Sequence, residues 1–459
     1  MKKELNFIFV FLGLVILALL ASMGAGQTTA SSGRTSKQKS PGNSKVSSTA
    51  ASKLIAIKVT GTERYSEKEI LPASGLQLGQ NVSEGDFKEA ARSLGDTGLF
   101  SDVVYSFSFA DAGTKLELQL TDIEKSKLIP AVFENFVWFT DDELLSELRQ
   151  RVPLFKGFVP PSGTFPDRIS EALQAILTEK QLPGRVDYLR QGKQDGGNLT
   201  AIAYRVTDVE IRIRGFEFPG ASKEQAALLT TAARKLVGAA YARSSMAVVA
   251  PIDLLPVYLQ RGYLKAAFGA SSARVVKESS GEQDPLEVQV DAIMPVTPGK
   301  VYATSAVAWK GNSAVKVDEL QGLIHMPAGQ PANAVRLMSD LEGVHKLYRS
   351  RGYMAAQVTP AAAIDDEKST VHYDLNVVEG DQYKMGELEI VGLDTGAKAH
   401  LQDAWTLREG DPYNADYAKK FLDATNQLLP AGVSWSVSVH EAVDAKDKTV
   451  DVTIRFQVK

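Results

Sequence analysis

One unit of sequence occurs five times after residue 52, and a repeat of this kind constrains the fold more than any single motif does. In the first copy an alternating strand at residues 54–59 leads to Gly61, and the capping-box sequence at residues 66–69 then predicts the start of a helix. The opening residues of the five copies lie 74 to 96 residues apart and are Gly61, Asn135, Gly215, Gly311 and Gly392.

The distance from the opening residue to the first helix is constant in four copies. An apolar residue follows nine positions later, as Ile70, Leu144, Leu320 and Leu401. Asparagine is the residue that best replaces glycine at positive φ, so we expect Asn135 to adopt the glycine conformation. The third copy departs from the pattern, because a longer stretch separates Gly215 from its capping box at Ser222.

The second half of each copy has its own pattern. A second helix is expected to end at a left-handed glycine followed by an apolar residue. These pairs are Gly98-Leu99, Gly262-Tyr263, Gly352-Tyr353 and Gly432-Val433, whereas the second copy has Gln181-Leu182. Two alternating strands then close each copy around polar turns near residues 110–114, 192–197, 279–284, 365–368 and 444–448.

The repeated unit therefore reads βααββ, and the fold class expected is α+β. We predict five tandem domains, each a three-stranded mixed sheet with two helices on one face, joined as an extended arm. Each unit can bury its own helices, unlike solenoid repeats, which need their neighbours for a core. The expected domain boundaries are 53–124, 125–208, 209–297, 298–383 and 384–459.

The first 52 residues differ in character from the repeats. Residues 1–26 have the layout of a signal peptide, with two lysines, an apolar run and small residues at the end. The apolar run also approaches the roughly 20 residues that span a bilayer, so an uncleaved anchor stays open as an alternative. Residues 27–52 are rich in Ser, Thr, Gly and Lys and are expected to be a disordered linker.

Composition and motifs indicate neither catalysis nor a cofactor. The formal net charge of -4 gives no strong attraction to phosphate backbones, so no nucleic-acid partner is expected. Cysteine is absent, and no Gly-x-Ser-x-Gly elbow or phosphate-binding loop occurs. No pair of histidines has metal-ligand spacing among His325, His345, His372, His400 and His440.

One stretch resembles a known family. Residues 377–392 read Val-Val-Glu-Gly-Asp-Gln-Tyr-Lys-Met-Gly-Glu-Leu-Glu-Ile-Val-Gly, which is similar to the join between POTRA (polypeptide-transport-associated) domains in the BamA family of outer-membrane assembly factors. Residues 298–311 are a looser version, and residues 61–66 and 97–103 also fit the pattern. The resemblance covers residues 53–459 and implies POTRA-type domains from the periplasmic part of such a factor. The family adds a membrane β-barrel after its POTRA domains, and no alternating segments follow Lys459, so insertion activity is not carried over.

The strand after each helix-ending glycine is expected to lie at a sheet edge. Its unpaired N–H and C=O groups can pair with another extended chain, which is called β-augmentation. The best candidates are residues 101–109, 353–359 and 433–439, although charge blunts many natural edges and such an edge binds nothing. The candidate protein-binding residues are Val103, Tyr105, Phe107, Val186, Tyr188, Ala356, Val358 and Val437.

The resemblance and the edges together imply a periplasmic protein-binding scaffold in outer-membrane protein assembly or translocation. Its expected partners are unfolded outer-membrane clients or a separate β-barrel protein, and it would associate with the outer membrane through them. The alternative is an inner-membrane-tethered scaffold of cell division or envelope synthesis. That alternative uses residues 1–26 as the anchor and residues 27–52 as the tether.

Overall fold

The computed structural model describes residues 52–192, 199–278, 286–425 and 434–458. The expected signal peptide lies outside the described residues, as does the expected linker up to residue 51. The turns expected at 192–197 and 279–284 lie outside them as well, apart from Gly192, and so does the pair Gly432-Val433.

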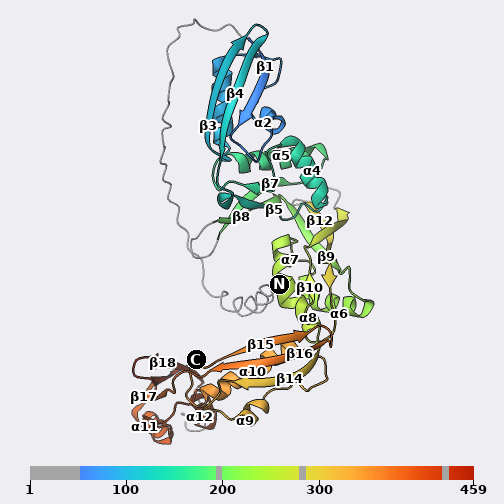
Figure 1. Cartoon of the computed structure of the whole chain (residues 1–459). Coiled ribbons are helices and arrows are strands. Elements are labelled where there is room, and N and C mark those ends of the chain that lie inside the picture. Colours follow the sequence, from blue (N-terminus) through green and yellow to red (C-terminus); the bar gives the residue numbers. More distant parts are fainter. Residues whose placement is uncertain (1–51, 193–198, 279–285, 426–433, 459) are drawn as a thin grey trace. The chain divides into compact units, whose positions relative to one another are not determined.

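The described residues form a mixed α+β fold with five sheets of three or four strands and one further two-stranded sheet. The units built on the five larger sheets are called repeats 1 to 5. In each of them the last strand lies in the centre, parallel to the first strand and antiparallel to the strand before it. Figure 1 shows this for repeat 1, where β4 lies between β1 and β3.

Repeats 1 and 2 have the same strand order, with a short extra strand beside the first strand. The elements of repeat 1 are β1 (Ser52–Thr60), α2 (Glu67–Ala73), β2 (Asn81–Val82), α3 (Glu84–Asp96), β3 (Phe100–Ala110) and β4 (Gly113–Asp122). Those of repeat 2 are β5 (Ile129–Phe133), α4 (Asp141–Arg151), β6 (Phe158–Val159), α5 (Phe165–Glu179), β7 (Arg185–Gly192) and β8 (Leu199–Thr207).

Repeat 3 has an interrupted second helix and an interrupted third strand. Its elements are β9 (Val209–Glu217), α6 (Lys223–Ala233), a 3-10 turn (Arg234–Leu236), α7 (Arg243–Val249), a π-helical turn (Ala250–Leu254), α8 (Leu255–Leu259), β10 (Ala267–Phe268), β11 (Ser272–Glu278), β12 (Leu286–Ile293) and β13 (Val296–Thr297).

Repeats 4 and 5 return to the simple three-stranded order. The elements of repeat 4 are β14 (Ala303–Lys310), α9 (Val317–Gln321), α10 (Ala334–Arg349), β15 (Gln357–Asp365) and β16 (Thr370–Val378). Those of repeat 5 are β17 (Lys384–Val391), α11 (Thr395–Ala404), α12 (Tyr417–Thr425), β18 (Trp435–Asp444) and β19 (Thr449–Val458).

The opening glycine is fixed by a close approach to the central strand of its own repeat. Gly61 has φ +82°, and a Cβ atom there would lie 2.5 Å from the carbonyl oxygen of Leu120. The same contact recurs at Gly311 with Val377 and at Gly392 with Phe456. Only glycine avoids both the strained φ and this clash, which explains why the residue recurs.

The structure corrects the opening residue of repeat 3. Gly215 does not adopt positive φ, whereas Gly220 has φ +92° and a Cβ atom there would lie 2.1 Å from the carbonyl oxygen of Val296. Leu229 follows Gly220 by nine positions and is fully buried. The nine-residue step therefore holds in all five repeats, and the buried residues are Ile70, Leu144, Leu229, Leu320 and Leu401.

The expectation for Asn135 is also wrong. Asn135 is not among the residues with positive φ. Its amide instead donates to the Val206 carbonyl at 3.0 Å and accepts from the Val206 N–H at 2.8 Å. A side chain thus bridges to the central strand at the point where glycine lets the backbone approach it directly.

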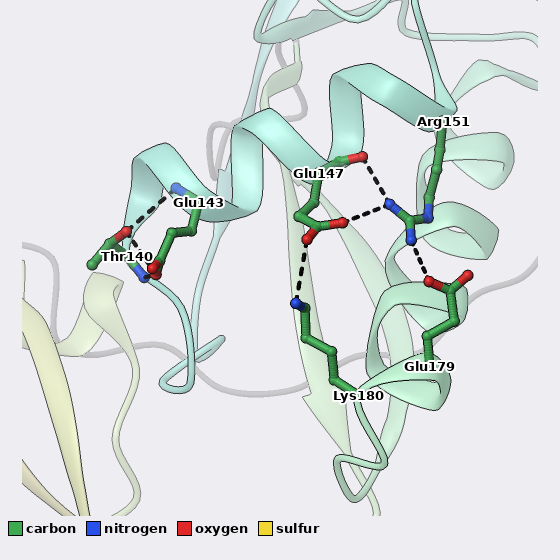
Figure 2. Close-up of polar contacts among 6 residues, drawn as sticks. All are labelled: Thr140, Glu143, Glu147, Arg151, Glu179 and Lys180. Carbon is green, nitrogen blue, oxygen red and sulfur yellow. Dashed lines mark hydrogen bonds and ion pairs between the residues drawn. The ribbon is translucent and has the colours of Figure 1, made fainter.

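The capping boxes read from the sequence are present. Thr140 accepts from the Glu143 N–H, while the Glu143 carboxylate accepts from the N–H and the hydroxyl of Thr140 (Figure 2). The hydrogen bonds from the Thr140 backbone and hydroxyl lower the pKa of Glu143. Ser66 and Ser222 start their helices in the same way.

A charge network joins the ends of the two helices of repeat 2, as Figure 2 shows. Glu147 contacts Arg151 at 2.8 Å and Lys180 at 3.2 Å, and Arg151 also contacts Glu179 at 2.5 Å. These side chains are partly exposed, and such pairs add little free energy one by one. The network links the end of α4 to the end of α5.

Candidate binding edges

Each repeat leaves one long strand at an open sheet edge, and the other edge is covered at one point. The open strands, at the ends of the strand orders, are β3, β7, β11, β15 and β18. On the opposite side the first strand receives a partner from the segment between the helices. That partner is β2 for β1 and β6 for β5, and the single bridges Arg212–Ala240, Ala303–Pro331 and Lys384–Pro412 serve β9, β14 and β17.

A native proline shows which main-chain groups of the open strand point outward. Pro360 lies within β15 and pairs with Leu375 of β16. A proline cannot donate to the ladder, so an edge strand accepts it only where its nitrogen faces away from the neighbouring strand. Main-chain groups alternate in direction along a strand, and those of Val358 and Ala362 therefore point outward with Pro360.

The same register identifies the equivalent position in other repeats. Val358 pairs with Val377, which contacts the opening glycine, and Pro360 follows two residues later. The pairs Val103–Leu120, Val186–Val206 and Val437–Phe456 occupy the place of Val358–Val377. The residues equivalent to Pro360 are therefore Tyr105, Tyr188 and Val439.

These three residues keep the outward N–H that Pro360 lacks, but the N–H of Tyr188 already donates to the Asp187 carboxylate at 2.8 Å. Tyr105 pairs with Leu118 in the same register, so its N–H is free to bind a further strand. Repeat 4 carries a natural device against edge pairing, because proline removes one donor from the middle of its open strand. The proline was visible in the sequence, but its meaning depends on the register, which the sequence analysis did not resolve.

The candidate residues lie on the open strands with one exception. Val103, Tyr105 and Phe107 are half-buried and pack on the core of repeat 1. Their side chains face the helices, and their main-chain groups face outward. These positions therefore offer backbone hydrogen bonds to a partner rather than side-chain contacts.

Val186, Val358 and Val437 likewise direct their side chains to the core side of the sheet. The outward N–H of Val186 is not free, because it donates to the Gln174 side chain at 2.8 Å. Val186 and Val358 are buried, whereas Val437 is 37% exposed. Tyr188 is half-buried, and its hydroxyl donates to Asp167 at 2.7 Å. Burial, followed by this hydrogen bond, raises the pKa of Tyr188.

Ala356 does not lie on an open strand. Its N–H donates to the Tyr353 carbonyl in a turn, and β15 begins one residue later at Gln357. The edge expected at residues 353–359 therefore runs from Gln357 to Asp365. The helix-ending glycine at Gly352 is followed by a turn before the strand begins, which the apolar pattern alone did not reveal.

Within the described ranges, the open strands of repeats 1 and 5 are the longest. β3 has 11 residues and β18 has 10, compared with 8 in β7 and 7 in β11. Neither long strand contains proline. β18 also leaves part of its core-side stripe exposed, with Val437 and Val439 each 37% exposed and Val443 50% exposed.

A carboxylate after the last strand ties down the loop that follows the opening glycine, and the sequence analysis missed it. Glu379 accepts from the Ser313 N–H at 2.8 Å, the Ser313 hydroxyl at 2.6 Å and the Ala314 N–H at 2.9 Å. The Tyr348 hydroxyl donates to it at 3.0 Å. Desolvation raises the pKa of Glu379, but these hydrogen bonds outweigh it, so the pKa is lowered.

Two further features are absent from the part of the chain that the structure describes. There, no group of three or more His, Cys, Asp or Glu side chains is arranged to hold a metal ion. No helix within the described ranges has the length and apolar character needed to cross a membrane.

Comparison with known proteins finds a family that matches one of these repeats. Residues 302–380 match the POTRA family, described as "Surface antigen variable number repeat". A stretch of 164 residues is 29% identical to a putative outer membrane protein assembly factor of Treponema pallidum. This stretch covers 33% of the chain and 19% of that relative's length. The chain thus carries a POTRA match in repeat 4 and is similar over a third of its length to a putative outer-membrane assembly factor.

Solved structures of POTRA domains are also similar in parts. The crystal structure of POTRA domains 3–5 of Haemophilus influenzae BamA is 16% identical, with a TM-score of 0.41, over 54% of this chain and 96% of that one. The N-terminal domain of Omp85 from Thermosynechococcus elongatus is 15% identical, with a TM-score of 0.23, over 54% of this chain and 97% of that one.

Proposed function

We propose that this chain is a periplasmic POTRA-repeat scaffold that acts in outer-membrane protein assembly or translocation. It binds unfolded outer-membrane clients, or a separate β-barrel partner, by β-augmentation at its open strands. The POTRA match at residues 302–380 and the similarity to a putative assembly factor support the role. The observation that carries the binding mode is the open strand β3, beside whose outward main-chain groups no strand of the described residues lies.

Main-chain pairing suits a scaffold that must accept many sequences. Each added backbone hydrogen bond contributes about 0.5–1.5 kcal/mol net, whatever the side chain of the client. Val103, Tyr105 and Phe107 supply outward groups at every second position of β3. Several such bonds give an affinity that binds a client and still releases it.

The proposal extends to the domain plan and the location. The five repeats are five POTRA domains with the boundaries expected from the sequence, and they act without catalysis. Residues 1–26 are a cleaved signal peptide in this proposal. The mature protein then begins between about Ala25 and Ala30 and fractionates with the periplasm or outer membrane. An intact N-terminus in the inner-membrane fraction would instead support the tethered scaffold.

Proline substitution tests the binding mode. Tyr105→Pro and Val439→Pro each remove one outward N–H and leave the ladder to the central strand intact. A fluorescent peptide copied from a transmembrane strand of a β-barrel protein serves as the ligand, and its Kd is measured by anisotropy. We expect the double variant to bind about tenfold more weakly, which corresponds to roughly 1.4 kcal/mol.

The matched control is Tyr105→Val, which removes the aromatic ring but keeps the N–H. It should bind the peptide as the unmodified chain does. Circular dichroism and thermal unfolding establish that each variant is folded. Unchanged affinity in a folded double-proline variant would refute β-augmentation at these two strands.

A further inference from the structure

Repeat 3 departs from repeats 1, 2 and 4 in its second helix. That helix has 13 residues in repeat 1, 15 in repeat 2 and 16 in repeat 4. In repeat 3 it is divided into α7, the π-helical turn Ala250–Leu254 and α8. Pro251 has no N–H to give to the carbonyl of Ala247, which accounts for the break.

The open strand of repeat 3 is also divided, between β10 and β11. Phe268 of β10 pairs with Val296, whose carbonyl contacts the opening residue Gly220. Phe268 therefore occupies the place of Val103 in repeat 1. Two residues later Ala270 stands at the break, where repeats 1 and 2 carry Tyr105 and Tyr188 on a continuous strand.

The two breaks meet at one cavity. It has a volume of about 510 Å³ and is lined by Met246, Ala250, Pro251, Phe268, Ala270 and Met294, among others. The first three come from the broken helix, and Phe268 and Ala270 come from the broken strand. In repeats 1 and 2 a tyrosine ring on the open strand packs on the core, and at the equivalent position repeat 3 has only a methyl group.

The cavity has one polar end. The Tyr241 side chain is 3% exposed, and its hydroxyl makes no hydrogen bond of standard geometry. Arg243 and Ser271 interact with this hydroxyl and line the cavity, whereas Tyr241 itself does not, so Arg243 and Ser271 form the polar end. Arg243 also forms an ion pair with Asp141. A ligand with an apolar body and a polar tip would find a partner at this end.

We propose that this cavity binds an aromatic side chain, with tyrosine as the best fit, from an extended polypeptide added to the open strand of repeat 3. The inference rests on the proposed function, because the strand pairing brings the side chain to the cavity. The bound ring replaces the one that repeats 1 and 2 supply from their own open strands. The tyrosine hydroxyl reaches the polar end formed by Arg243 and Ser271.

The walls suit such a guest. The volume falls within the range of about 300–1,000 Å³ that is usual for ligand sites. Phe268 is held edge-on by Tyr258 at 6.1 Å between ring centres and offers an aromatic partner. Met246 and Met294 are flexible side chains that adapt to rings of different size. Tryptophan and phenylalanine should therefore also be accepted.

The test uses the full chain and a ten-residue alternating peptide with benzoylphenylalanine, a photo-crosslinking aromatic residue, at its centre. After irradiation, mass spectrometry maps the crosslinked residues. Ala270 is exposed and lines the cavity, so Ala270→Tyr fills the cavity from within the chain. The control is Ala227→Tyr, at an exposed residue of α6 outside the lining. Ala247→Trp is a second filling variant, for use should Ala270→Tyr fail to fold.

We expect crosslinks at Met246, Met294 or Phe268 in the unmodified chain and in Ala227→Tyr, and at least a tenfold loss of them in Ala270→Tyr. Crosslinks at other repeats should persist in every variant. A peptide that binds but never crosslinks to the cavity overturns this inference and leaves the proposed function standing. A peptide that binds nowhere overturns the proposed function as well. Laurate binding that Ala270→Tyr blocks, without aromatic crosslinks, would assign the cavity to a lipid chain and also overturn the inference.

Discussion

A Cβ atom on Gly392 would lie 1.9 Å from the carbonyl oxygen of Phe456 in the central strand of repeat 5. The glycine also has φ +90°, a conformation that other residues adopt only with strain. The central strand β19 and the loop after β17 can therefore approach each other this closely only because Gly392 lacks a side chain.

We expect Gly392→Ala to lower the local free energy of unfolding of repeat 5 by at least about 3 kcal/mol, through backbone strain and the clash together. The control is Gly410→Ala. Gly410 has φ +88° but nothing within 4 Å of its would-be Cβ, so strain alone should cost about 1–2 kcal/mol. A chain of several units need not unfold in one step, so hydrogen exchange of amides in β19 is the proper measurement. Equal effects of the two substitutions would show that the close approach is unimportant.

Replacing Asn135 should lower the stability of repeat 2 by more than the partial exposure of this residue implies. Asn135→Ala removes both hydrogen bonds to Val206 and leaves a buried backbone segment without these partners, at a cost of about 1–3 kcal/mol. Asn376→Ala is the control, because Asn376 is exposed and makes only contacts of 3.5 Å. Its effect should stay within about 0.5 kcal/mol. Hydrogen exchange of amides in β8 measures the effect of Asn135→Ala, and exchange of amides in β16 measures that of Asn376→Ala.

The sequence pattern predicted the repeated architecture well because glycine and the nine-residue step report directly on a backbone contact. It failed where a different residue solves the same problem. Asn135 bridges to Val206 with its side chain, and in repeat 3 the contact moves from Gly215 to Gly220. A glycine in a sequence shows that a close approach is allowed, but the partner is known only from the fold.

The sequence pattern predicted which strands lie at the sheet edge, but it did not predict where each strand begins. Strand ends depend on turns that carry little hydrophobic signal, so Ala356 was placed on the edge although it lies in a turn. The outward direction of the Tyr105 N–H depends on register, which the sequence did not provide. The cavity of repeat 3 was missed because it arises where a break in a helix meets a break in a strand.

Low pH should weaken the hydrogen bonds by which Glu379 holds the loop at Ser313 and Ala314 in repeat 4. The pKa of Glu379 is lowered in the fold from 4.5, so its contribution is fully present above that value and is lost as the pH falls through the lower folded pKa. We expect Glu379→Gln to destabilise repeat 4 at pH 7 and to differ less from the unmodified chain near pH 3. Hydrogen exchange in β16 at several pH values measures the difference. A constant difference across this range would show that the carboxylate charge is not what holds the loop.

Repeat 4 should gain binding when its native proline is removed. Pro360→Val restores an outward N–H in the middle of β15, so a client peptide should bind this strand more tightly, and the chain should self-associate more readily. Ala361→Val is the control, because the main-chain groups of Ala361 point toward β16 under the register argued above. Peptide affinity and sedimentation velocity test both effects. If the two substitutions behave alike, proline is not what blunts this edge.

The most direct test of the central claim is amide hydrogen exchange of the full chain with and without a saturating client peptide. We expect binding to slow exchange at Val103, Tyr105 and Phe107 in β3 and at Val437 and Val439 in β18. Protection should be weaker along β15, where Pro360 interrupts the outward donors. Slower exchange confined to helices or loops, with these five amides unchanged while the peptide is bound, would contradict β-augmentation.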